Sequence, residues 1–205
     1  MIHQHELKAN DVHAYTLEML KEHLKIKVDG YICKTDMILN VLIKASAENS
    51  SLEAACGDLE ETADSNTIRE YLNEALPIKE LREQEKQVNK VLACGTPADL
   101  VRTDIEVALD FHDEPFYGKQ AGTRQVTCAG QAKKGTTHFV RIATAYIIWR
   151  QVRLTLAVRY VLPEDETLEI LKFLLQRLKK LGCKAKVLYM DKGFASTSII
   201  QYLTA

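Results

Sequence analysis

The sequence "EVALDFHDEPFYGK", residues 106–119, joins an apolar segment to a cluster of acidic residues. From residue 103, apolar side chains occupy every second position up to Leu109, which predicts a strand with one buried face. The strand is expected to end at Asp110, so that Asp113 falls in the following turn. An acidic side chain at the end of a buried strand is favourable where it meets water, a metal ion or a charged ligand.

A second apolar segment, "KAKVLYMD" at residues 184–191, has the same form and ends at Asp191. Ligands of open α/β sheets gather at strand ends. If the two strands are parallel neighbours, Asp110 and Asp191 meet at one edge, where their repulsion favours a bound cation such as Mg²⁺ or Mn²⁺. The alternative is that each aspartate only caps a turn, where this residue is common.

The segments between these strands predict a mixed sheet. "HFVRIATAYIIW" and "VRLTLAVRYVL" are rich in β-formers and form a hairpin around Arg150 and Gln151. A helix follows Pro163, with acidic residues in its first turn, basic residues in its last, and Gly182 after it. The stretch 114–137, rich in Gly and Lys, is predicted to be a loop. The predicted order from residue 101 is therefore β-β-β-α-β-α, a mixed α/β sheet.

Residues 1–100 are predicted to form a separate helical region. Two short helices, 52–59 and 67–76, follow a longer one and are separated by a polar turn, as in a helix-turn-helix. In that interpretation Asn66, Thr67 and Arg69 begin the recognition helix and contact base edges. A plain helical bundle is the alternative, and the acidity of this region favours it.

Charge is distributed in blocks. Residues 1–114 hold 12 Lys or Arg against 23 Asp or Glu, whereas residues 115–163 hold 8 basic residues and no acid. A one-signed block of this length indicates a binding surface for a polyanion. Chance distribution on solvated strands is the alternative. The candidates for phosphate contacts are Lys119, Arg124, Lys133, Lys134 and Arg141.

The composition excludes several classes of protein. No run approaches the 18 or so apolar residues of a membrane span, so no membrane partner is expected. The five cysteines are scattered, without a CxxC pair, which is typical of reduced thiols in a cytosolic protein and not of a zinc site.

The two aspartate motifs together resemble those of DDE-type insertion-sequence transposases, which have an RNase-H-like catalytic core. "VALDFHDEPFYGK" is similar to the first acidic motif, and "VLYMDKGFAS" to the second. The resemblance covers roughly residues 103–205. It implies that Asp110 and Asp191 are catalytic and bind Mg²⁺ or Mn²⁺. Asp113 is a weaker candidate for the first carboxylate.

The same resemblance implies the partners. DNA of the element ends and of the target would bind to a protein that is a homodimer when full length, in the prokaryotic cytoplasm at the nucleoid. Such enzymes cut DNA at the element ends and join it to the target. The helical region would bind the terminal repeats.

The sequence departs from this family in one respect. The family's third carboxylate is a Glu on a helix well downstream of the second Asp, and here only fourteen residues follow Asp191. We therefore expect the RNase-H-like sheet to be incomplete, as in a truncated or frameshifted transposase, and this chain to be inactive alone. Two alternatives stay open: a non-catalytic DNA-binding protein, and a different RNase-H-like nuclease.

Overall fold

The structure is a computed structural model that describes residues 8–118 and 125–204. The chain divides into two compact units, Met1–Gln87 and Val88–Ala205, which we call the helical unit and the sheet unit. The boundary falls inside the helix Leu81–Cys94, and therefore before the boundary expected at residue 100. No helix within the described residues has the length and apolar character needed to span a membrane.

The helical unit consists of short helices around a core of its own. Buried side chains at one face of α2, among them Ile38, Leu39 and Val41, pack with Ile68 of α4. The prediction of helices in this region is therefore confirmed. The elements are α1 (Ala9–His23), α2 (Thr35–Glu48), α3 (Leu52–Asp58), α4 (Ser65–Ala75), the 3-10 turn η1 (Ile78–Glu80) and the first part of α5 (Leu81–Cys94).

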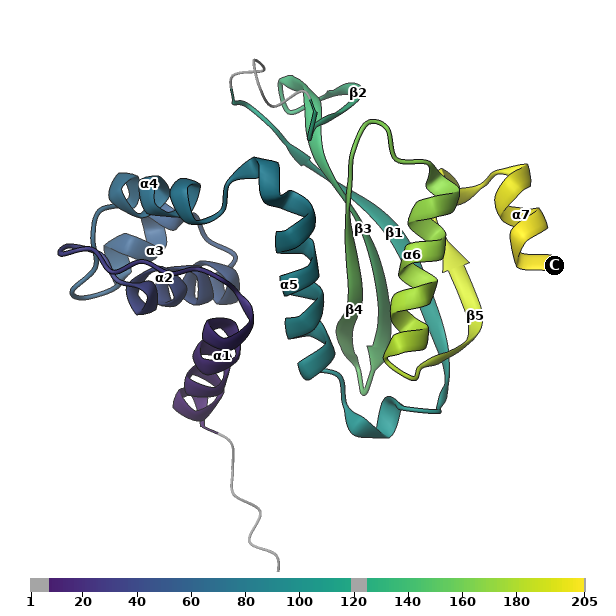
Figure 1. Ribbon diagram of the computed structural model, residues 1–205, viewed down its shortest axis with the longest axis horizontal. Helices are drawn as coiled ribbons and strands as arrows, with labels where there is room; N and C mark the ends of the chain where they lie inside the picture. The colour runs from purple at the N-terminus through teal and green to yellow at the C-terminus, as the bar shows by residue number, and fades with distance from the viewer. Residues whose placement is uncertain (1–7, 119–124, 205) are drawn as a thin grey trace, which may run out of the picture. The chain divides into compact units, whose positions relative to one another are not determined.

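The sheet unit is a mixed α/β structure (Figure 1). After the end of α5 and η2 (Ala98–Leu100) come β1 (Asp104–Pro115), β2 (Cys128–Lys133), β3 (Thr136–Trp149), β4 (Val152–Val161), α6 (Thr167–Lys180), β5 (Lys184–Met190), η3 (Lys192–Phe194) and α7 (Thr197–Thr204). Strand β3 pairs antiparallel with β1 on one side, and with β4 and β2 on the other. Strand β5 pairs with β1 in parallel.

Two predictions about the strands are wrong. Strand β1 does not end at Asp110 but continues to Pro115, because β3 is long enough to pair with it as far as Phe139. The region predicted to be a loop contains β2, which forms a hairpin with β3. Lys134 and Gly135 both have positive φ, as a two-residue hairpin turn requires, and this turn brings the two strands together.

The hairpin predicted between β3 and β4 is confirmed. Arg150 and Gln151 form its turn with φ of 50° and 68°. The left-handed conformation at both positions gives the backbone a twist that matches the twist of the flanking strands.

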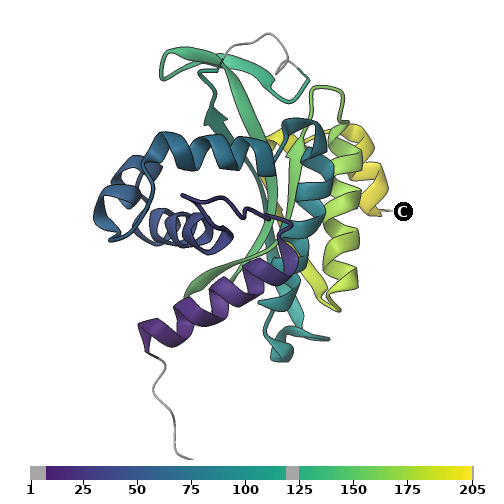
Figure 2. The same ribbon diagram turned by 60° about the vertical axis from the view of Figure 1, so that its left-hand side comes forward.

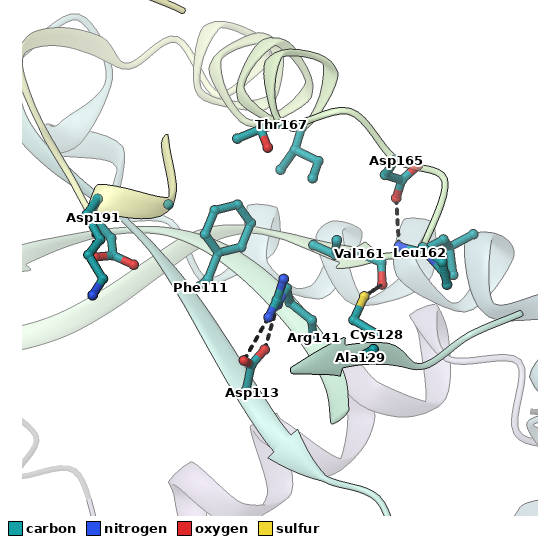
Figure 3. A pocket seen from close by; sticks show the side chains of 14 residues that line it. Phe111, Asp113, Cys128, Ala129, Arg141, Val161, Leu162, Asp165, Thr167 and Asp191 are labelled. Atoms are coloured by element: carbon teal, nitrogen blue, oxygen red, sulfur yellow. Dashed lines mark hydrogen bonds and ion pairs between the residues drawn. The ribbon is translucent and has the colours of Figure 1, made fainter. Parts of the chain in front are cut away.

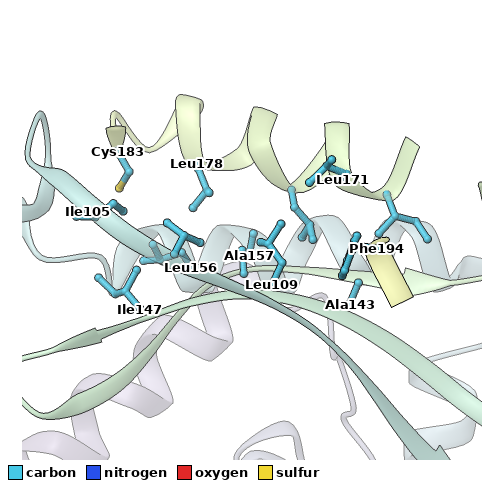
Figure 4. Close-up of a cluster of buried hydrophobic side chains, with 14 of the residues drawn as sticks. Ile105, Leu109, Ala143, Ile147, Leu156, Ala157, Leu171, Leu178, Cys183 and Phe194 are labelled. Carbon is cyan, nitrogen blue, oxygen red and sulfur yellow. The ribbon is translucent and has the colours of Figure 1, made fainter. Parts of the chain in front are cut away.

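Helix α6 covers one face of the sheet and makes the main core (Figures 2 and 4). Its apolar residues recur at helical spacing, and Ile170, Leu171, Leu174 and Leu178 are buried. They pack on side chains that alternate along the strands, at positions 105, 107 and 109 of β1 and positions 143, 145 and 147 of β3. The helix then ends at Gly182, which has φ of 74°. The crossover from β4 to β5 through α6 is what lets β5 lie parallel to β1.

Asn89, near the end of α5, binds the free edge of β4. Its side-chain amide donates to the carbonyl oxygen of Val158 over 2.8 Å and accepts from the N–H of Val158 over 3.1 Å. The Asn89 side chain is buried, and Arg177 of α6 donates to its backbone oxygen over 2.8 Å. One amide therefore satisfies two backbone groups of an edge strand that would otherwise lack partners.

Replacing Asn89 by Ala should destabilise the sheet unit by about 2 kcal/mol, because two backbone groups of Val158 lose their partners in a half-buried position. Urea unfolding followed by circular dichroism measures this change. Lys90→Ala, an exposed substitution at the next position of α5, is the matched control. Equal stabilities of the two variants would contradict this role of Asn89.

Candidate functional site

The two aspartates predicted to be catalytic are neighbours in the backbone. The register of β1 and β5 pairs Leu109 with Met190, and the N–H of Asp191 donates to the carbonyl oxygen of Leu109 over 3.1 Å. Asp110 and Asp191 follow directly on this pair. The prediction that these two strands are parallel neighbours is therefore confirmed. Neighbouring strands lie about 4.8 Å apart, so this pairing brings Asp110 and Asp191 close together.

Asp110 lies within β1 and not at its end. Side chains alternate between the faces of a strand, so Asp110 shares a face with Glu106 and Ala108, opposite the buried Leu109. Within the described residues, the Asp110 carboxylate has no hydrogen bond and no ion pair. This carboxylate is therefore available to an external ligand.

Asp191 begins the 3-10 turn η3. Its Oδ1 accepts from the N–H of Lys192 over 2.6 Å, and the residue is exposed. An aromatic contact holds the η3 turn against β1, because the rings of Phe111 and Phe194 stack with centroids 4.3 Å apart. Gly193 lies so close to Phe111 that a Cβ there would approach the ring to 2.8 Å. Glycine at this step lets the backbone after Asp191 reach β1.

Asp191 also borders a pocket of about 750 Å³ in the sheet unit (Figure 3). The pocket lies between the sheet and the start of α6 and opens on the face that carries Phe111. It is lined by Phe111, Asp113, Cys128, Ala129, Arg141, Val161, Leu162, Pro163, Asp165, Thr167, Ile170, Asp191, Lys192 and Gly193. Asp110 is not among them, because it leaves β1 on the other face. In this structure the two aspartates are thus adjacent in the backbone, but Asp191 borders the pocket and Asp110 does not.

Asp113 is paired with Arg141 inside this pocket (Figure 3). The guanidinium Nε donates to Oδ1 over 2.7 Å and Nη2 donates to Oδ2 over 2.9 Å, across the β1–β3 pair. The Arg141 hydrogen bonds hold the pKa of the Asp113 carboxyl below its usual value, and the same contact raises the pKa of Arg141. The expectation that Asp113 lies in a turn is wrong, and Arg141, predicted to contact phosphate, already has a carboxylate partner.

The other predicted phosphate contacts fall in two groups. Lys133 and Lys134 are exposed at the tip of the β2–β3 hairpin. Neither has an ion pair with any described residue, which leaves both charges available to an anion. Lys119 and Arg124 lie outside the described residues.

The residues predicted to contact base edges lie at the start of α4. Asp64 caps this helix, and its carboxylate accepts from the N–H groups of Asn66 and Thr67 and from the Thr67 hydroxyl, at 2.7–3.2 Å. These bonds, the Thr67 hydroxyl first, lower the pKa of Asp64. Arg69 donates to Asn66 over 3.2 Å. The N–H groups of Asn66 and Thr67 and the Thr67 hydroxyl are therefore bound by the cap, Asp64, and Arg69 contacts the Asn66 side chain.

The protein ligands for a metal ion are few. Within the described residues no group of three or more His, Cys, Asp or Glu side chains could hold a metal. Asp165, which also borders the pocket, accepts from the N–H of Leu162 over 2.9 Å and lies 3.7 Å from Arg159. Asp113 and Asp165 are thus neutralised within the protein, whereas Asp110 and Asp191 have no basic partner among the described residues.

One polar residue beside Asp110 was not predicted. Thr144 of β3 lies directly opposite Asp110, and its hydroxyl oxygen is shielded from solvent without a hydrogen-bond partner among the described residues. No motif marks this threonine, because its importance depends on the register between β1 and β3. Only the paired strands reveal it.

Comparison of the chain with models of protein families, with curated proteins and with solved structures finds no match.

Replacing Asp113 by Asn should destabilise the protein by about 1–2 kcal/mol at pH 7, because a half-buried charged pair with two hydrogen bonds is lost. Since the pKa of Asp113 is lowered in the folded state, its contribution is complete above its unfolded pKa of about 3.9 and disappears as the pH falls through the folded value. The stability difference between wild type and Asp113→Asn should therefore shrink below about pH 4.

Urea unfolding at several pH values measures this difference. The control is Glu114→Gln, which removes an exposed pair with His112 and should change stability little. A difference that stays constant down to pH 2 would show that the Asp113 carboxylate is not held ionised by Arg141.

Proposed function

We propose that this chain supplies two of the three metal-binding carboxylates of a DDE-type transposase core, Asp110 and Asp191, and binds the DNA ends of an insertion element. The observation that carries the proposal is the parallel pairing of β1 with β5, which brings two otherwise unpaired carboxylates to neighbouring backbone positions. The resemblance of the two sequence motifs to this family gives the reaction class.

The topology of the sheet unit supports the RNase-H-like part of the proposal. The sheet has β4 and β2 on one side of β3, and β1 followed by β5 on the other, with α6 as the crossover into β5. Three antiparallel strands followed by a helix and a strand parallel to the first is the arrangement that an RNase-H-like core requires. Strand β2 is an addition, since it extends the edge of the sheet beyond β4.

The donor chemistry of the two aspartates fits a divalent cation. Mg²⁺ and Mn²⁺ prefer carboxylate oxygens, and Mg²⁺ commonly binds through one or two carboxylates together with water and substrate phosphate. Asp110 and Asp191 would hold the ion, and Asp191 would turn toward Asp110 to do so. Asp191 is exposed and its carboxylate has one hydrogen bond, to Lys192. The bound ion would neutralise phosphate charge and lower the pKa of a coordinated water.

The remaining groups of the site would bind and orient DNA. Lys133 and Lys134 extend on the hairpin at the same end of the sheet unit as the pocket, since Cys128 and Ala129 of that hairpin line the pocket. Lys192 follows Asp191 directly and is exposed. The Arg141–Asp113 pair links β1 to β3. Because the two charges cancel, this pair contributes little net charge to the site.

The direct test is nicking of a supercoiled plasmid that carries the DNA flanking this reading frame, with Mn²⁺ present. Because no third ligand joins the two aspartates in the described residues, we expect the chain alone to be inactive in Mg²⁺ and to nick DNA only weakly in Mn²⁺, and Asp110→Ala or Asp191→Ala should abolish that nicking. Asp113→Asn, which alters a carboxylate already paired with Arg141, is the matched control and should retain nicking.

Two results would favour another function. Salt-sensitive DNA binding without nicking in any metal, unchanged by Asp110→Ala and Asp191→Ala, would indicate a non-catalytic DNA-binding protein. Nicking confined to branched DNA junctions would indicate a different RNase-H-like nuclease.

Phosphate binding by the hairpin gives a separate prediction. The double substitution Lys133→Gln with Lys134→Gln should lower DNA affinity and reduce the slope of log K against log salt by about 2, since two phosphate contacts are lost. Fluorescence anisotropy with a labelled duplex at several salt concentrations measures the slope. Lys186→Gln, at an exposed lysine of β5, is the control, and an equal effect there would show that the hairpin has no special role.

A further inference from the structure

Thr144 occupies an unusual position for a polar strand residue. It lies in the middle of β3, paired on one side with Asp110 of β1 and on the other with Val158 of β4. Its hydroxyl oxygen is inaccessible to solvent and has no hydrogen-bond partner within the described part of the chain. A shielded hydroxyl without a partner destabilises the folded state, so a valine of the same shape would fit this site better.

Asp110 has the complementary property. Residues directly opposite each other in an antiparallel pair share a face, with Cβ atoms about 4.5–5.5 Å apart. The Thr144 hydroxyl and the Asp110 carboxylate are thus on the same face of the sheet at adjacent positions. The carboxylate has no partner in residues 8–118 or 125–204. A free donor therefore lies beside a free acceptor.

We propose that Thr144 is the positioning residue for Asp110: when a divalent cation binds, the Thr144 hydroxyl, which has no partner among the described residues, donates a hydrogen bond to one oxygen of the Asp110 carboxylate and orients the other oxygen toward the cation. The inference rests on the proposed metal-binding role of Asp110. A carboxylate ligand whose second oxygen is held by a donor loses less rotational freedom on binding, and such outer contacts commonly contribute 10- to 100-fold to metal affinity.

The other neighbours of Thr144 on this face of the sheet do not accept a hydrogen bond from its hydroxyl. Alternation places Ile142 and Tyr146 on the same face of β3, and Val158 is opposite on β4. Tyr146 makes no hydrogen bond with the Thr144 hydroxyl in this structure. Of the side chains paired with Thr144, Asp110 alone accepts hydrogen bonds.

The experiment measures Mn²⁺ binding to the full chain by the electron paramagnetic resonance signal of free Mn²⁺. Thr144→Val should weaken binding on the order of 10-fold, and Thr144→Ser, which retains the hydroxyl, should restore most of the affinity. The melting temperature of metal-free Thr144→Val should equal or exceed that of wild type, because a hydroxyl without a partner is removed. Thr155→Val, a strand threonine away from Asp110, is the control and should bind Mn²⁺ like wild type.

The variants distinguish a failure of the positioning role of Thr144 from a failure of the metal site at Asp110. If Asp110→Ala abolishes Mn²⁺ binding but Thr144→Val binds like wild type, Thr144 has no positioning role and the proposed function stands. If Asp110→Ala itself binds Mn²⁺ like wild type, the proposed metal site is wrong. In the Asp110→Ala background, Thr144→Val should have no additional effect on Mn²⁺ binding, and an effect there would also contradict the assignment.

Discussion

The parallel pairing of β1 with β5 is the constraint on which the candidate site depends. Two strands of the same direction cannot be joined by a tight turn, and the chain needs a crossover to return. Helix α6 provides it, and the apolar side of α6 covers the buried alternate residues of β1 and β3. Burial of this face fixes the register, because a slip by one residue would expose all of these side chains. The same register places Asp191 beside Leu109 and Asp110.

Acidic residues close together in the sequence have different environments in the fold. Asp113 faces the pocket and is neutralised by Arg141, whereas Asp110, three residues earlier, lies on the other face without a basic partner. The His112–Glu114 pair is exposed, with 2.6 Å between the ring Nε2 and the carboxylate oxygen. The acidic cluster therefore divides by strand alternation into a structural carboxylate and a free one. Charge pairing, more than proximity in sequence, distinguishes the candidate ligand.

Local patterns in the sequence predict the elements well. The α6 helix, the β3–β4 hairpin and the parallel strand ending before Asp191 follow from apolar period, capping charges and turn residues. The extension of β1 is not predictable in this way, because residues 112–114 are polar and Pro115 is a poor strand former, and the strand conformation of this segment comes from pairing with β3. Strand β2 was missed for a similar reason: its sequence is rich in small residues, and the turn at Lys134 and Gly135 determines its pairing.

The contrast between local sequence patterns and strand pairing also applies to the candidate site. The sequence makes Asp110 and Asp191 candidates because each ends a run of apolar residues. It cannot show that Arg141 is occupied by Asp113 or that Thr144 faces Asp110, since both depend on the register of β1 and β3. The acid-free block from residue 115 to 163 is likewise less available to a polyanion than its composition indicates, since Arg141 and Arg150 pair with Asp113 and Asp99.

The most direct measurement is diffraction from crystals of the chain soaked in Mn²⁺, with the ion located by its anomalous signal. We expect one ion bonded to carboxylate oxygens of both Asp110 and Asp191, with the Asp191 side chain turned toward β1. An ion bound elsewhere, or both carboxylates left without a metal at saturating Mn²⁺, would contradict it.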